Sequence, residues 1–134
     1  MTWYYKGEEL SEIPEGYVGI VYLITNLFNG KQYVGKKIFH FNKTKTVKGK
    51  KKRTVVESDW QKYYGSNKEL QEHVALFGED KFRREVLHLC QNKSQMSYLE
   101  LREQIDRRVL ESDKYYNSWI SARVRGKNIL KGLS

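Results

Sequence analysis

The clearest hydrophobic pattern in the chain is a run of β-branched, aromatic and aliphatic residues over positions 18–25. Such a run is typical of a buried β-strand. Asn29-Gly30 follows, a dipeptide that favours a tight turn with positive φ. Residues 31–35 then resume as a second strand. The pattern therefore predicts a β-hairpin.

Two helices and a third strand are expected after the hairpin. A helix over about residues 66–77 carries Leu70, Val74 and Phe77 on one face, and Gly78 ends it. Residues 82–89 have the composition of a strand. The longer second helix, from residue 94 to about residue 110, has apolar side chains at helical spacing at Tyr98, Leu101, Ile105 and Val109.

Shorter elements complete the expected fold. Ser58 is a plausible cap for a short helix that carries Trp60, and residues 119–124 are expected to form a final short helix. We interpret the aromatic residues Trp60, Tyr63 and Tyr64 as core residues. The alternative is that these aromatics contact DNA. The order of elements predicts an α/β fold of the α+β sandwich type, in which helices flank a small, three-stranded, mostly antiparallel sheet.

Length and composition point to a single domain over residues 1–134. With 39% hydrophobic residues the chain can form a core, and no apolar run reaches the ~20 residues of a membrane span. Cys90 is the one cysteine, which excludes a disulfide framework and a thiolate zinc cluster. We therefore expect a reduced, cytoplasmic protein without a membrane partner.

The formal net charge of +9 is concentrated in one segment. Residues 16–56 contain no Asp or Glu, and most of their cations lie in a basic loop expected over residues 36–56. A solvated, mobile loop is one interpretation; the other is a nucleic-acid partner, because phosphates relieve the repulsion among the cations. The residues expected to bind nucleic acid are Lys36, Lys43, Lys45, Lys48, Lys50, Lys51 and Lys52.

Candidate chemistry begins with two tyrosines, one on each strand of the hairpin. The chain has no glycine-rich phosphate loop, no serine elbow and no pair of histidines at zinc-binding spacing. Tyr22 and Tyr33 lie eleven residues apart and are expected to share a sheet face, which would bring their hydroxyls close together. From their spacing alone, ordinary packing in the core is the more common fate of such tyrosines.

Short motifs follow one another along the chain: Ile20-Val21-Tyr22, Tyr33-Val34-Gly35, Gly65-Ser66-Asn67, Phe77-Gly78-Glu79-Asp80-Lys81-Phe82, Val86-Leu87, Tyr98-Leu99-Glu100 and Tyr116-Asn117. This ordered set resembles the motifs of the GIY-YIG endonucleases. The matches run from about residue 18 to residue 117 and are closest to small, free-standing phage members and to the catalytic domain of phage homing endonucleases. In the first motif Ile20 stands where the family usually has glycine.

The resemblance implies a metal-dependent DNA endonuclease and assigns roles to single residues. Tyr22 would activate water, with nearby lysines and the metal lowering its pKa, and Tyr33 would orient water or phosphate. Glu100 would bind one Mg²⁺ or Mn²⁺ ion per active site, with Glu103 as the competitor. The family's phosphate-binding arginine has no direct match. Its candidates are Lys37 and Arg53, and Asn117 is expected to brace the site through the backbone.

Double-stranded DNA is the expected partner, in the cytoplasm of a bacterial host if the chain is phage-encoded. One active site cuts one strand, so a homodimer or higher oligomer is one route to double-strand cleavage. The basic loop is expected to supply most of the affinity and little of the sequence choice. The alternative is a non-catalytic, basic nucleic-acid-binding protein. A third, weaker interpretation has Trp119 and the C-terminal cations Arg123, Arg125, Lys127 and Lys131 docking a partner subunit.

Overall fold

The computed structural model describes residues 2–121 together with Gly126 and Ile129. Its centre is a five-stranded sheet in the order β2-β1-β7-β3-β4, in which β1 and β7 are parallel and every other neighbouring pair is antiparallel. The strands are β1 (Trp3–Tyr5), β2 (Glu8–Leu10), β3 (Gly19–Asn26), β4 (Gln32–Ile38) and β7 (Phe82–Cys90). The predicted hairpin is β3–β4, and the predicted third strand is β7.

The sheet is larger than the three strands expected from the sequence. Two short strands, β1 and β2, extend it beyond β7. They are held by Trp3, which is buried and donates its indole N–H to the carbonyl oxygen of Trp60 at 2.7 Å. A three-residue strand gives almost no periodic signal, so only its pairing with a distant strand reveals it.

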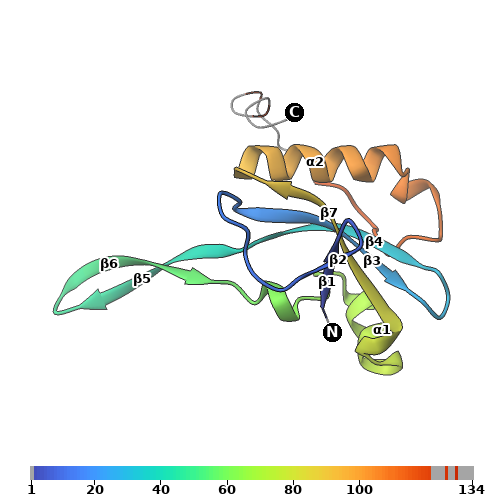
Figure 1. Ribbon diagram of the computed structural model, residues 1–134, viewed down its shortest axis with the longest axis horizontal. Helices are drawn as coiled ribbons and strands as arrows, with labels where there is room; N and C mark the ends of the chain where they lie inside the picture. The colour runs from blue at the N-terminus through green and yellow to red at the C-terminus, as the bar shows by residue number, and fades with distance from the viewer. Residues whose placement is uncertain (1, 122–125, 127–128, 130–134) are drawn as a thin grey trace.

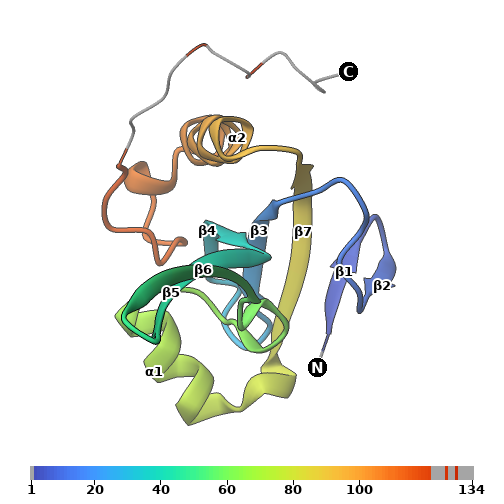
Figure 2. The same ribbon diagram turned by 90° about the vertical axis from the view of Figure 1, so that its left-hand side faces the viewer.

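Helices cover both faces of the sheet, which confirms the α+β sandwich. Helix α2 (Lys93–Asp106) lies on one face, and α1 (Lys68–Phe77) lies on the other side, as Figure 1 and Figure 2 show. Alternate residues of β3 belong to two separate clusters: Ile20 packs with Leu70 of α1, and Val21 packs with Leu99 of α2. This burial on both faces explains the unbroken apolar run of β3.

The helix boundaries and one helix face differ from the prediction. Asn67 and Asn92 cap the two helices, each through its side-chain oxygen, and α2 ends at Asp106. Because α2 is shorter than expected, Val109 packs from a separate 3₁₀ turn, η3 (Val109–Glu111). Ile105, expected on the apolar face, is exposed, and the buried face includes Leu99 instead. The described residues also form the 3₁₀ turns η1 (Trp60–Lys62) and η2 (Glu79–Lys81).

Trp60 is fully buried in the core, as its first interpretation predicts. Residues 119–121 have no regular secondary structure, which contradicts the start of the predicted final helix. The rest of that helix and the four C-terminal cations proposed to dock a partner, Arg123, Arg125, Lys127 and Lys131, lie outside the described residues. Among the helices of the described part of the chain, none combines the length and apolarity needed to cross a membrane.

The basic segment is a β-hairpin, not the loop expected from its composition. Strands β5 (His40–Val47) and β6 (Lys50–Glu57) pair along their whole length and project from the body of the molecule (Figure 1). Lys48 and Gly49 make the turn, and both have positive φ, as a type I′ hairpin turn requires. Because the first turn position is a lysine and not Asn, Asp or Gly, the sequence does not indicate a hairpin turn here. The expected exposure is confirmed, since nearly every hairpin residue is exposed.

Candidate active site

A pocket of about 400 Å³ lies along β4, which forms one edge of the central sheet. It brings together five residues that the sequence singled out for catalysis or for DNA binding: Tyr22, Tyr33, Lys36, Glu100 and Asn117. They come from two strands, from α2 and from the segment after η3. The other lining residues are Ser66, Asn67, Ser97, Gln104, Ser118, Trp119 and Ser121.

The two tyrosines share a sheet face, as predicted, with ring centroids 6.2 Å apart. Tyr22 pairs across the strands with Gly35, so its ring lies over a residue without a side chain. A Cβ atom added at Gly35 would lie 2.6 Å from Cζ of Tyr22 and 2.9 Å from Cε2 of Tyr33. Glycine at this position therefore lets Tyr22 reach across β4 to the pocket. The tyrosines pack in the core and line the pocket at the same time.

Burial controls the protonation of the tyrosine pair. Burial of Tyr22 raises its pKa well above the usual value, and the neighbouring hydroxyls of Tyr63 and Tyr33 raise it further. The expectation that nearby lysines lower this pKa is therefore wrong for the protein by itself. The pKa of Tyr33 is also raised by burial, although a hydrogen bond with Ser66 (3.1 Å between hydroxyls) opposes the shift. Both hydroxyls keep their protons at neutral pH.

Glu100 is the carboxylate that faces the pocket. Its side chain is 16% exposed, and burial raises its pKa, an effect that Lys36 partly opposes from 4.0 Å. The Lys36 ammonium also donates to Oγ of Ser97 at 2.9 Å, which fixes it beside the carboxylate. A buried carboxylate with one cation at this distance is incompletely compensated, so a further cation in the pocket would stabilise it.

The competing carboxylate, Glu103, is already engaged on both oxygens. Nε2 of His88 lies 3.1 Å from Oε2, and Nε of Arg107 donates to Oε1 at 3.1 Å. Burial alone would raise the pKa of Glu103, but these hydrogen bonds outweigh it and lower the pKa. Glu103 does not line the pocket. The geometry therefore favours Glu100 over Glu103 as a metal ligand.

Two further polar residues of α2 line the pocket and were missed in the sequence. Ser97, Glu100 and Gln104 follow one another at intervals of three and four residues, so they form a polar stripe on one helix face. Gln104 is buried and donates to the carbonyl oxygen of Val34 in β4 at 3.2 Å. A polar stripe on the buried side of a helix is the signal that could have identified them.

The cations predicted to hold phosphate are separated by the fold. Adjacent residues of a strand point to opposite faces, so Lys36 and Lys37 lie on different faces of β4. Lys36 lines the pocket, whereas Lys37 shares the face of Tyr33 but does not line it. The Lys37 ammonium lies 2.7 Å from Oδ1 of Asp59 and 4.1 Å from the ring centroid of Tyr63. Arg53 lies on the exposed hairpin and does not line the pocket. Among the described residues, the lysine that lines the pocket is Lys36, which was expected from the sequence to bind DNA.

Asn117 binds the backbone of β4, as expected for a bracing residue. Its Oδ1 accepts from the N–H of Val34 at 3.0 Å, and its Nδ2 donates to the carbonyl oxygen of the same residue at 2.8 Å. The edge strand is thereby fixed next to Tyr33. A role of Asn117 in catalysis stays a prediction.

Replacing Asn117 with Ala is expected to lower the free energy of unfolding by about 1–3 kcal/mol, because the buried N–H of Val34 loses its partner. Urea denaturation measures this change. The matched control is Asn29→Ala, which removes an exposed side-chain hydrogen bond to Lys31 and should cost less than about 1 kcal/mol. Equal losses for the two variants would contradict the bracing role.

Comparison with known proteins places these motifs in one family. The family model described as "Putative endonuclease segE, GIY-YIG domain" matches residues 3–120, a range that spans the central sheet, both helices and nearly all of the pocket. Neither the curated proteins nor the solved structures gave a significant match. The match confirms the resemblance inferred from the ordered motifs. The chain therefore belongs to the segE GIY-YIG domain family.

Proposed function

We propose that the protein is a DNA endonuclease that hydrolyses phosphodiester bonds of double-stranded DNA with one divalent ion, Mg²⁺ or Mn²⁺. The observation that carries this proposal is the convergence of two tyrosine hydroxyls, the Lys36 ammonium and the buried Glu100 carboxylate on one pocket. Membership of a family of endonuclease domains supports it. A phage or mobile-element origin, resembling the homing endonucleases, fits a small domain of this family.

The donor set of the pocket fits a hard divalent cation. Glu100 offers a carboxylate in a buried site where its charge is incompletely compensated. Within the described residues, no group of three or more His, Cys, Asp and Glu side chains gathers to form a metal site. Mg²⁺ commonly binds through one or two carboxylates and keeps several waters, so Glu100 alone is sufficient on the protein side. When bound, such an ion supplies charge stabilisation at the phosphoryl oxygens.

The protein groups around Glu100 have complementary roles. Lys36 is fixed next to the carboxylate and can contact a phosphate oxygen as a point charge. Tyr22 keeps its proton, so its hydroxyl can donate one hydrogen bond and accept another, which suits the orientation of an attacking water. Tyr33, held through Ser66, can direct its hydroxyl to the same water or to the phosphate. These residues orient the reactants before any proton moves.

The proposed active site holds one set of catalytic groups, which sets the expected number of cuts. Such a site hydrolyses one strand, so a monomer is expected to nick duplex DNA first. Double-strand breaks would then need a second binding event or a homodimer. Nicked circular plasmid is therefore the expected early product.

Supercoiled plasmid is expected to be nicked in the presence of Mg²⁺ and to stay intact in EDTA, as gel electrophoresis would show. The Tyr22→Phe variant should lose about 10²–10⁴-fold in cleavage rate while it still binds DNA, because only the hydroxyl at the pocket is removed. Tyr5→Phe is the matched control, since Tyr5 packs against the same core but lies outside the pocket. Tight, salt-sensitive binding by the wild type with no nicking under any divalent ion would show instead that the protein is a non-catalytic DNA-binding protein.

A further inference from the structure

The β5–β6 hairpin has two chemically different faces. Residues paired directly across an antiparallel ladder share a face, and successive residues alternate between faces. The register therefore separates the side chains into two sets. The lysine face carries Lys43, Lys45, Lys50 and Lys52 together with Phe41, Val47, Thr54 and Val56. The mixed face carries His40, Asn42, Thr44, Thr46, Lys51, Arg53, Val55 and Glu57.

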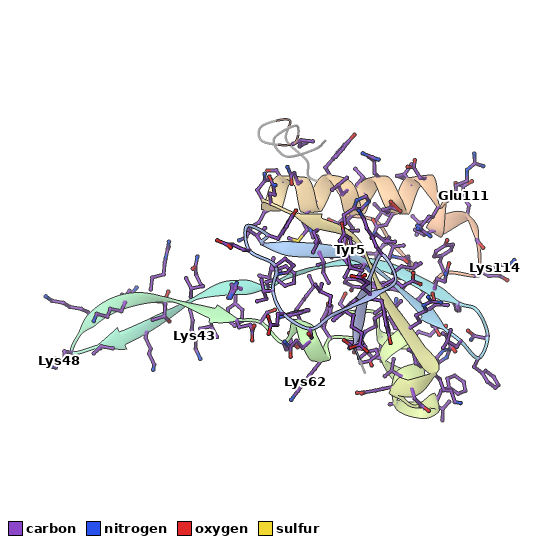
Figure 3. All side chains as sticks on the ribbon, in the orientation of Figure 1. Tyr5, Lys43, Lys48, Lys62, Glu111 and Lys114 are labelled. Carbon is purple, nitrogen blue, oxygen red and sulfur yellow. The ribbon has the colours of Figure 1, made fainter. Side chains whose placement is uncertain are left out.

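The shape of the hairpin suits a groove of duplex DNA. Each strand has eight residues, which corresponds to a ribbon of ~26 Å. The major groove of B-DNA is roughly 12 Å wide and admits a two-stranded β-ribbon. Figure 3 shows Lys48 at the end of the hairpin that lies farthest from the body of the molecule. The side chains of both faces are thus free of the protein core along most of the ribbon.

The lysine face lacks an internal counter-charge. Lys45 and Lys52 lie directly opposite each other, an arrangement in which like charges destabilise a ladder. The ion pairs found within the described residues do not include any lysine of this face. A polyanion would remove this repulsion, so the lysine face is suited to phosphates.

The mixed face carries side chains that can distinguish bases. An arginine can bind guanine through two hydrogen bonds, an asparagine can do the same with adenine, and an apolar side chain can contact the thymine methyl group. Arg53 and Asn42 lie on adjacent cross-strand pairs of this face. Val55, paired with Asn42, is 70% exposed, which burial in the protein does not explain.

We infer that the hairpin enters the major groove of duplex DNA with its mixed face toward the base edges, while the long lysine side chains reach the phosphates of the groove walls. Arg53 and Asn42 then select the sequence. This inference rests on the proposed function in taking DNA as the partner. It replaces the expectation that the basic segment contributes little to sequence choice.

The test is selection of binding sites by the full chain from a pool of duplex DNA with randomised positions, in EDTA so that no cleavage occurs. The wild type is expected to enrich a short motif. The Arg53→Lys variant should lose the preference at a guanine by roughly tenfold or more, with an unchanged salt dependence, because it keeps the charge but loses the fork of donors. The Asn42→Ala variant should lose the preference at an adenine in the same way.

The matched control is the double variant Lys45→Ala/Lys52→Ala. It should weaken binding to all sequences alike and reduce the slope of log K against log salt by about 2. In the enriched site, 7-deazaguanine removes the N7 acceptor and should weaken wild-type binding but not that of Arg53→Lys. Thermal melts check that each variant stays folded.

Two outcomes would overturn the inference: a wild type that enriches no motif, or a motif that Arg53→Lys and Asn42→Ala leave intact. Neither outcome bears on cleavage, which the plasmid assay measures separately. A protein that nicks plasmid without base preference would keep the proposed function and lose this inference. A protein that enriches a DNA motif but does not nick plasmid would keep this inference and lose the proposed function.

Discussion

Replacement of Glu100 with Gln is expected to reduce the rate of plasmid nicking by about a thousandfold and, at the same time, to raise the melting temperature at neutral pH. The rate falls because the amide has no charge with which to hold a divalent ion beside the phosphate. Stability rises because the wild-type protein keeps a carboxylate in a site where burial disfavours its charge.

The sign of the pH dependence follows from the raised pKa of Glu100 in the folded state. Below the pKa that Glu100 has in the unfolded state, its carboxyl is neutral in both states and does not lower the free energy of unfolding. As the pH rises through the folded pKa, the wild type loses stability that the Glu100→Gln variant keeps. Melting curves in EDTA near pH 4 and near pH 8 should therefore show a larger difference between the two proteins at the higher pH.

Glu103→Gln is the matched control on the same helix. Because Glu103 binds His88 and Arg107 outside the pocket, this variant should retain cleavage. It should lose about 1–3 kcal/mol of stability as two charge-assisted hydrogen bonds are weakened. Added Mg²⁺ should raise the melting temperature of the wild type and of Glu103→Gln, but not of Glu100→Gln. Loss of cleavage in Glu103→Gln with full cleavage in Glu100→Gln would reverse the metal assignment.

The second large effect is expected at Gly35. A methyl group there would overlap the Tyr22 hydroxyl and lie 2.6 Å from Cζ of that ring. The Gly35→Ala variant must displace a buried ring or the edge strand, which should cost about 1–3 kcal/mol of stability. Cleavage should fall by about a hundredfold, because the displacement moves the hydroxyl that lines the pocket.

Gly126→Ala is the matched control, since a Cβ atom at Gly126 meets no atom within 4 Å in the part of the chain that the structure describes. It should leave the urea midpoint and the rate of nicking unchanged. A Gly35→Ala protein with wild-type stability and rate would show that the close approach of Tyr22 to β4 is unimportant. A stable Gly35→Ala protein with lost activity would separate the position of Tyr22 from its contribution to the core.

Local signals accounted for the centre of the fold. The apolar run of β3, the Asn29-Gly30 turn and β4 were predictable because a hairpin is specified by residues close together in the chain. The ordered motifs also indicated the family and pointed to Tyr22, Tyr33 and Glu100, all of which line the pocket. Strands β1 and β2 were not predicted, because three-residue segments carry too little pattern. They are strands only because β1 pairs with β7 and β2 pairs with β1.

The hairpin, the family and the excess of positive charge could therefore be predicted from the sequence by itself, since they depend on local pattern and composition. Tertiary structure decided which side chains meet. Lys36 lines the pocket, whereas Lys37 contacts Asp59 and the Tyr63 ring outside it. Contacts with His88 and Arg107 engage Glu103, while Glu100 faces the pocket. Burial decided the protonation of Tyr22. The register of β5 and β6 sorted the basic residues onto two faces, because cross-strand pairing is a property of the folded chain.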